Sequence, residues 1–311
     1  MQIDIVVAFF VLGMVSVLVN SRIDFPKGLY QTLILFLLLA IGLKGGMALN
    51  EHVSSALVWQ SLAVLALGFL LPLLAFPLLR WVGGWSRTDA AATAAHYGSV
   101  SVGTFAVGVA FLETQQIHYE AYLPLFVALL EVPAIAVGLV LAKSYGNNTQ
   151  VGKLAHELLL NQGVLLLIGG LLIGWWAGER VANIAPLFFE LFHGVLALFL
   201  LQMGRVAAQR LGDLKGKTVF LLSFGVVMPL LGAGIGGVLG YGLGLSIGGT
   251  TLMAVLGASA SYIAVPAALS VSLPSANLSL SLTASLAITF PFNVMVGIPV
   301  YLALASYWMS G

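Results

Sequence analysis

Long apolar stretches separated by short polar breaks run through the whole chain. A helix needs about 20 apolar residues to cross the hydrocarbon core of a bilayer. The break before residue 248 is weak, because residues 241–249 are glycine-rich and uncharged, so nine or eleven spans remain alternatives. The best count is ten transmembrane helices, at residues 2–19, 28–49, 55–79, 88–112, 120–142, 157–177, 184–208, 217–244, 248–272 and 279–306. The first stretch has no basic residue before Arg22, so we expect a mature helix rather than a signal peptide.

The composition supports a membrane protein and excludes several other classes. Sixty per cent of the residues are apolar and 7% are charged, so most of the outer surface must face lipid. The formal net charge of +1 argues against nucleic-acid binding, which needs a concentrated basic patch. The chain has no cysteine, which rules out disulfides, thiolate catalysis and cysteine-ligated metals.

The basic residues gather on one side of the predicted membrane topology. Cytoplasmic loops of membrane proteins carry an excess of lysine and arginine, so this side is predicted to be cytoplasmic. An even number of spans then places both termini outside, and we expect a multi-pass protein of the cell (inner) membrane. The residues on this side are Arg22, Lys27, Arg80, Arg87, Lys143, Lys153, Arg205, Arg210, Lys215 and Lys217.

The two halves of the sequence resemble each other at an offset of about 158 residues. We predict a first five-helix repeat over residues 1–143, a cytoplasmic linker over 144–156 and a second repeat over 157–311. Since each repeat holds an odd number of spans, the second copy is inverted in the membrane, as in many secondary transporters. Coincidence among apolar helices is the alternative reading. The pairs are Gly46 with Gly204, Ser101 with Ser259, and Pro133 with Pro291.

Two spans, the fourth and the ninth, are poorly suited to continuous helix. Residues 96–104 are rich in glycine and hydroxyl side chains, and residues 257–266 end in Pro266, which removes a backbone donor. Two such breaks at equivalent positions are expected to cross near the midplane, where helix N-termini present free N–H groups to an anion. Close helix packing by small residues is the alternative explanation. The hydroxyl groups available to a small oxyanion are those of Ser99, Ser101, Thr104, Ser259 and Ser261.

Ionisable side chains at membrane depth are expensive, so each is a functional candidate. Glu131 lies in the middle of span five and could ligate a cation or carry a proton; a structural carboxyl paired with Lys44 is the alternative. Lys44 could also extend to the interface without a specific role. His193, in span seven with Glu190, is expected to pack rather than to bind a metal. The sequence contains no nucleotide-binding loop, nucleophile elbow or zinc-protease motif, so no enzyme is predicted.

Residues 42–49, 96–137 and 257–301 resemble the sodium-dependent bicarbonate transporter (SbtA-like) permease family, and the similarity covers nearly the whole chain. The resemblance implies a sodium/bicarbonate symporter with ten spans and external termini. It further implies a homotrimer and a PII-like regulatory protein on the cytoplasmic face. The substrate site that it implies comprises Gly98, Ser99, Ser101, Gly103, Thr104, Ala258, Ser259, Ala260 and Ser261.

Three of the departures from that family's pattern bear on ion coupling. Tyr262 stands where the family has an aspartate, Glu131 replaces an aspartate, and Lys44 replaces a threonine. We assign all three to ion coupling, with sodium near Glu131 as the candidate coupling ion. If the Lys44 ammonium takes the electrostatic role of sodium, transport is expected to be nearly insensitive to sodium, and Lys44→Thr is expected to restore the dependence.

The leading hypothesis is therefore a secondary transporter of a small anion, with sodium-coupled bicarbonate symport as its specific form. A proton-coupled or sodium-independent transporter of another small carboxylate is the alternative. An intramembrane sensor or enzyme is a third reading, but it lacks a paired acid and base or a metal triad at membrane depth.

Overall fold

A computed structural model of the protein describes residues 5–21, 23–52, 54–142, 162–212 and 218–310. These segments contain helices and no strand. The predicted linker, and Arg22, Lys143, Lys153, Lys215 and Lys217, lie outside the described residues. In chain order the main helices are α1 (Ile5–Leu18), α2 (Lys27–His52), α3 (Ser55–Pro77), α4 (Arg87–Gly98), α5 (Val102–Thr114), α6 (Pro124–Leu130), α7 (Pro133–Ala142), α9 (Gln162–Ala177), α10 (Phe192–Leu211), α11 (Thr218–Gly242), α12 (Ile247–Ala258), α13 (Ala264–Ser272), α14 (Leu278–Leu282), α15 (Phe290–Phe292) and α16 (Ile298–Ser310).

Seven segments within the described residues are long and apolar enough to cross a membrane. They coincide with the predicted spans two to six, eight and ten, which is the pattern of a polytopic membrane protein. The helices at the first and ninth predicted spans, α1 and α12, are apolar but shorter. The seventh predicted span begins with a π-helical turn (Pro186–Glu190) and continues as α10, which carries two arginines toward its end.

Helices α1, α2, α9 and α10 form one group, which we call the flanking bundle. Its main contacts pair α1 with α10 and α2 with α9. Glycines four residues apart allow α2 and α9 to approach closely: a Cβ added at Gly42 would lie 3.0 Å from the Cα of Gly170, and one at Gly174 would lie 3.1 Å from the Cα of Gly46. Small residues at this spacing are a common basis of helix association in membranes.

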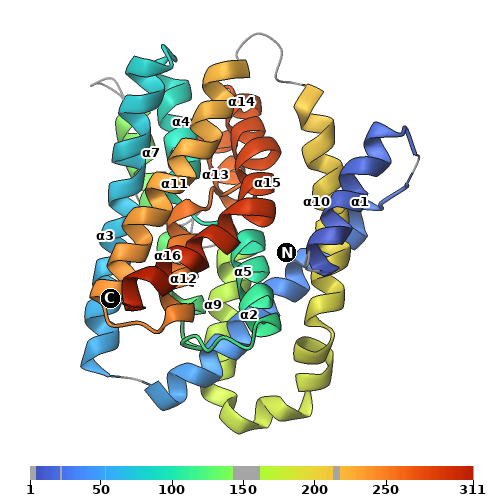
Figure 1. The fold of residues 1–311 in the computed structure, drawn as a ribbon, viewed down its shortest axis with the longest axis vertical. Coiled ribbons are helices and arrows are strands. Elements are labelled where there is room, and N and C mark those ends of the chain that lie inside the picture. The colour runs from blue at the N-terminus through green and yellow to red at the C-terminus, as the bar shows by residue number, and fades with distance from the viewer. Residues whose placement is uncertain (1–4, 22, 53, 143–161, 213–217, 311) are drawn as a thin grey trace.

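The remaining long helices form a second group, the central bundle, which contains α3, α4, α5, α7, α11, α12 and α16. Here α4 packs on α3 and α7, and α12 packs on α11, α16 and α5. In Figure 1, α3, α4, α7, α11 and α16 lie on one side of the molecule, and α1 and α10 lie on the other.

The outer faces of both groups are apolar. On α3 the exposed side chains include Leu62, Phe69 and Leu73, which recur at helical spacing on one face. Trp81 and Trp176 are exposed near helix ends, where tryptophan is enriched at the membrane interface. These exposed apolar side chains form a surface that is suited to lipid.

Two helices are interrupted where the sequence predicts it. Helix α4 ends at Gly98 and α5 begins at Val102, after a non-helical segment whose Ser101 side chain caps α5 by accepting the Thr104 N–H. Helix α12 ends at Ala258 and α13 begins at Ala264. The non-helical segments 99–101 and 259–263 are called the first and second breaks below.

Candidate functional site

The two breaks lie against each other inside the central bundle. The Ser101 N–H donates to the Ser259 hydroxyl at 3.1 Å, across 158 residues of sequence. The Ser261 N–H donates to the His96 carbonyl at 2.8 Å, and the His96 Nδ1 lies 2.6 Å from the Ser261 carbonyl oxygen. Both breaks are buried, so these bonds satisfy backbone groups that neither helix can satisfy by itself.

A small cavity of about 20 Å³ opens beside the breaks. It is large enough for about one water-sized group. Its polar lining comes from Ser101, Ser261, Glu131 and Tyr262, and apolar side chains of α2, among them Ile34 and Leu38, close it on the side of the flanking bundle.

Helices α5 and α13 both begin at this cavity. Val102, the first residue of α5, and Ile263 and Ala264, which precede and open α13, belong to its lining. A helix N-terminus carries partial positive charge and free N–H groups, so two N-termini at one cavity favour an anion there without any basic side chain.

Glu131 introduces a carboxylate next to the same cavity. It lies between α6 and α7, is 4% exposed and accepts a hydrogen bond from the Ser99 hydroxyl at 3.1 Å. No lysine or arginine forms an ion pair with it among the described residues. A buried carboxylate in this position needs a proton or a bound cation to neutralise it.

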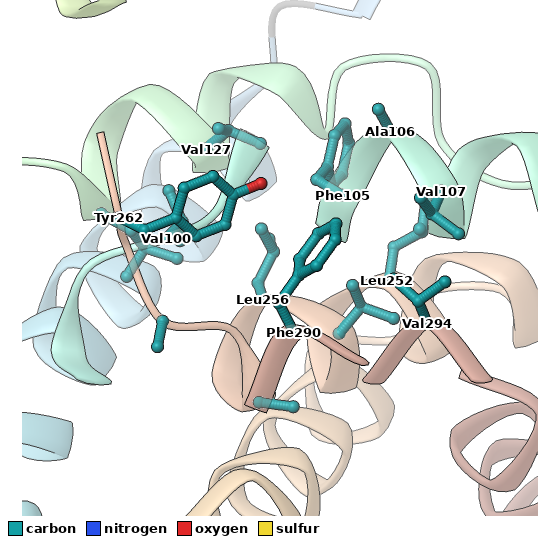
Figure 2. Packing of buried hydrophobic residues seen from close by; sticks show 14 of the residues in the cluster. Val100, Phe105, Ala106, Val107, Val127, Leu252, Leu256, Tyr262, Phe290 and Val294 are labelled. Carbon is teal, nitrogen blue, oxygen red and sulfur yellow. The ribbon is translucent and has the colours of Figure 1, made fainter. Parts of the chain in front are cut away.

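Tyr262 fills space beside the breaks with an aromatic ring. Its centroid lies 5.3 Å from that of Phe290 in an edge-to-face arrangement, and Figure 2 shows the ring near Val100 and Val127. The hydroxyl is buried and faces Ser101 without a well-formed hydrogen bond, in the space that a side chain at Gly103 would need. This ring leaves a smaller cavity than a short side chain would.

The sequence matches the Na+-dependent bicarbonate transporter superfamily over residues 5–306. The chain belongs to that superfamily. No curated protein matches the sequence. The broken helices and the cavity between them therefore belong to a member of a transporter superfamily.

The predicted substrate residues of this superfamily member have different positions relative to the cavity. Ser101 and Ser261 line the cavity, and Ser99 lies beside it with its hydroxyl bonded to Glu131. The Ser259 hydroxyl donates to the Leu256 carbonyl at 2.9 Å and accepts the Ser101 N–H, so it holds the breaks together.

The other predicted residues support the breaks by packing. A Cβ at Gly98 would lie 2.8 Å from the Cβ of Ala134, so the small residue permits close approach of α7. Thr104 and Ala260 are buried, and the Ala258 carbonyl accepts a hydrogen bond from the Asn293 amide at 2.9 Å.

The interpretation that pairs Lys44 with Glu131 is wrong. Lys44 forms an ion pair with Glu113 near the end of α5 and donates to the Tyr119 hydroxyl at 2.9 Å. It lies toward the end of α2, beside the last turn of α5, whereas Glu131 lies at the breaks. The Nε2 of His193, the predicted packing residue, is 3.7 Å from Glu113.

The C-terminal helical segment contributes polar contacts that the sequence reasoning missed. Two of its buried hydroxyl groups bond to α4: Ser281 with Thr93 and Thr289 with Tyr97, each at 2.7 Å. This segment contains two π-helical stretches, Thr283–Thr289 and Asn293–Gly297. The signal in the sequence was a run of serine, threonine and asparagine within an apolar span, which indicates polar packing between helices in a membrane.

Proposed function

We propose that this transporter moves a small anion, bicarbonate, across the membrane by sodium-coupled symport. The observation that carries the proposal is the meeting of two helix N-termini at one buried cavity, which has room for about one water-sized group and must widen to admit bicarbonate. That arrangement supplies N–H donors and positive dipole ends, and the Ser101 and Ser261 hydroxyls that line the cavity add further hydrogen-bonding groups. Membership of the superfamily supports the same substrate and ion.

Glu131 supports coupling to a cation. A carboxylate at the cavity would repel the anion unless a sodium ion or a proton neutralises it. Bound sodium beside Glu131 would remove that repulsion and would make the binding of each ion favour the other. A proton on Glu131 gives the second candidate, a proton-coupled transporter of bicarbonate or another small carboxylate, because Glu131 has no cationic partner among the described residues.

The inverted repeat is part of the same proposal. The predicted equivalents Gly46 and Gly204 occupy equivalent contacts: Gly46 lies against α9, and Gly204 lies against α1, so each second helix packs on the first helix of the other half. The equivalents Ser101 and Ser259 meet each other at the breaks. The corresponding topology has ten spans and both termini outside, and the protein is placed in the inner membrane. A homotrimer and a cytoplasmic PII-like partner complete the proposal by resemblance to the family.

Uptake of labelled bicarbonate into proteoliposomes tests the function. We expect an inward sodium gradient to drive accumulation above the level reached with a choline gradient, and Glu131→Gln to abolish the stimulation by sodium. Stimulation by an inward proton gradient, equal with sodium and with choline, would favour the second candidate. No uptake of bicarbonate or of a short carboxylate under either gradient would refute both.

A further inference from the structure

A second, larger cavity of about 90 Å³ lies between the flanking and central bundles. Along α5 its lining runs from Phe105, four residues after the first break, through Val109 to Glu113 near the helix end. The opposite wall is α2, with Ala40, Ile41 and Lys44, and the start of α10 closes it with Phe192. The cavity therefore extends along α5 from about one turn after the first break to the far end of the helix.

The polar groups of this cavity gather at the end that is distant from the breaks. Lys44 forms an ion pair with Glu113, and the Tyr119 hydroxyl accepts from Lys44 at 2.9 Å and donates to Glu113 at 2.8 Å. Burial raises the pKa of Tyr119 to about 12, so the phenol keeps its proton at neutral pH. His193 approaches the second carboxylate oxygen of Glu113 at 3.7 Å.

The two side chains that face Glu113 come from a different bundle than Glu113 itself. Lys44 and His193 belong to α2 and α10 of the flanking bundle, whereas Glu113 belongs to α5 of the central bundle. Both interactions converge on Glu113, so this one carboxylate ties the two bundles together at the end of the cavity.

The ion pair is accessible to a dissolved anion. The side chains of Lys44 and Glu113 are 44% and 28% exposed, and partly exposed ion pairs of this kind are weak. The Glu113 carboxylate offers one oxygen to the ammonium and the other to His193, and a free carboxylate or bicarbonate carries the same kind of charged oxygens. The volume accommodates an ion of a few heavy atoms, since a single water needs only about 10–15 Å³ on the same measure.

We propose that this cavity is a second binding site for a small monovalent oxyanion of the carboxylate type. Lys44 is the cation that binds the anion, and Glu113 is an internal carboxylate that occupies Lys44 while the site is empty. That the ligand is also the transported anion rests on the proposed function. When an anion displaces Glu113, the tie between the bundles at Glu113 is released.

The absence of native cysteine allows a direct binding test. A cysteine in place of Ala121, a partly buried residue of the cavity wall, reports access of a methanethiosulfonate reagent to the detergent-solubilised protein. We expect bicarbonate, formate and acetate to slow its modification, and chloride to have little effect. A cysteine in place of the exposed Ala182, which lies outside the cavity lining, serves as the matched control and should react at the same rate with and without these anions.

Charge substitutions in the Ala121→Cys background identify the groups responsible. Lys44→Gln should abolish protection and Lys44→Arg should retain it, which separates loss of charge from misfolding. Glu113→Gln removes the competing carboxylate, so the anion concentration giving half-protection should fall about two- to fivefold. Protection that survives in Lys44→Gln, or that weakens in Glu113→Gln, would overturn the proposal.

A last variant separates this site from the one at the breaks. Ser101→Val should impair uptake while protection of the cysteine at position 121 remains. Since protection is measured without transport, failure of bicarbonate uptake leaves the binding result intact. Absence of protection by all three oxyanions would overturn the second site whatever the uptake assay gives.

Discussion

Replacement of His96 should weaken the contact between α4 and the second break. The Nδ1 of this fully buried residue lies 2.6 Å from the Ser261 carbonyl oxygen, and its own carbonyl accepts the Ser261 N–H. A carbonyl can only accept, so Nδ1 must be the protonated nitrogen. His96→Ala removes the hydrogen bond from Nδ1 and leaves the backbone bond from the Ser261 N–H to the carbonyl of residue 96. Ser261 is then held less firmly.

The expected loss of stability has two contributions, the broken hydrogen bond and the cavity left by the imidazole ring. A buried carbonyl left without its donor costs about 1–3 kcal/mol, and the space left by the ring adds about 1–2 kcal/mol. His96→Ala should therefore lower the free energy of unfolding by about 2–5 kcal/mol. His96→Asn places an amide N–H close to the position of Nδ1 and should recover most of the hydrogen-bond part, whereas His96→Gln places its N–H near Nε2 and should not.

Unfolding of the detergent-solubilised protein by increasing mole fractions of sodium dodecyl sulfate measures this difference. Uptake assays on the same variants should give the same order, with His96→Asn retaining more transport than His96→Gln. Equal stability of the alanine, asparagine and glutamine variants would refute the reasoning, because the Nδ1 bond would then contribute nothing measurable.

Three further predictions concern packing, topology and binding. Gly46→Leu should lower the melting temperature, because its side chain would meet the α9 backbone, whereas Gly28→Leu, with open space around it, should not. Single cysteines in place of the exposed residues Ser86 and Glu179 should differ in labelling by a membrane-impermeant thiol reagent added to intact cells. Only the cysteine at position 179 should be labelled, and labelling of position 86 alone would invert the proposed orientation. Ser101→Val should weaken binding of the transported anion about ten- to a hundredfold, as a hydrogen bond to a charged group is worth about 1.5–3 kcal/mol; unchanged affinity in a calorimetric titration would place the anion elsewhere.

The positions of both helix breaks could be predicted from the sequence. Glycine and serine lower helix propensity, and Pro266 cannot donate to the preceding turn, so the local chemistry around residues 96–104 and 257–266 disfavours continuous helix. The predicted spans two to six, eight and ten coincide with long apolar helices for the same kind of reason, since length and apolarity are local properties.

The roles of individual serines could not be predicted, because they depend on the rotation and depth of each helix. Ser259 and Ser261 are two residues apart and look equivalent in the sequence, but one holds the opposite break and the other lines the cavity. His96 was part of the predicted break, yet its bond to Ser261 spans 165 residues. Such long-range partners follow from tertiary packing and have no local signal.

The partner of Lys44 was the least predictable feature, and it changes the expectation for coupling. Since Lys44 is bound to Glu113, it does not neutralise Glu131, and the idea that this lysine takes the place of sodium loses its structural basis. We therefore expect Lys44→Thr to leave the ratio of uptake with and without sodium unchanged, even if it alters the affinity for the anion. Glu131→Gln should instead reduce that ratio to about one, because the amide carries no charge for a cation to neutralise. Proteoliposomes with matched sodium and choline gradients measure both variants side by side. A clear rise of sodium dependence in Lys44→Thr, with Glu131→Gln still responding to sodium, would return the lysine to the coupling site and remove Glu131 from it.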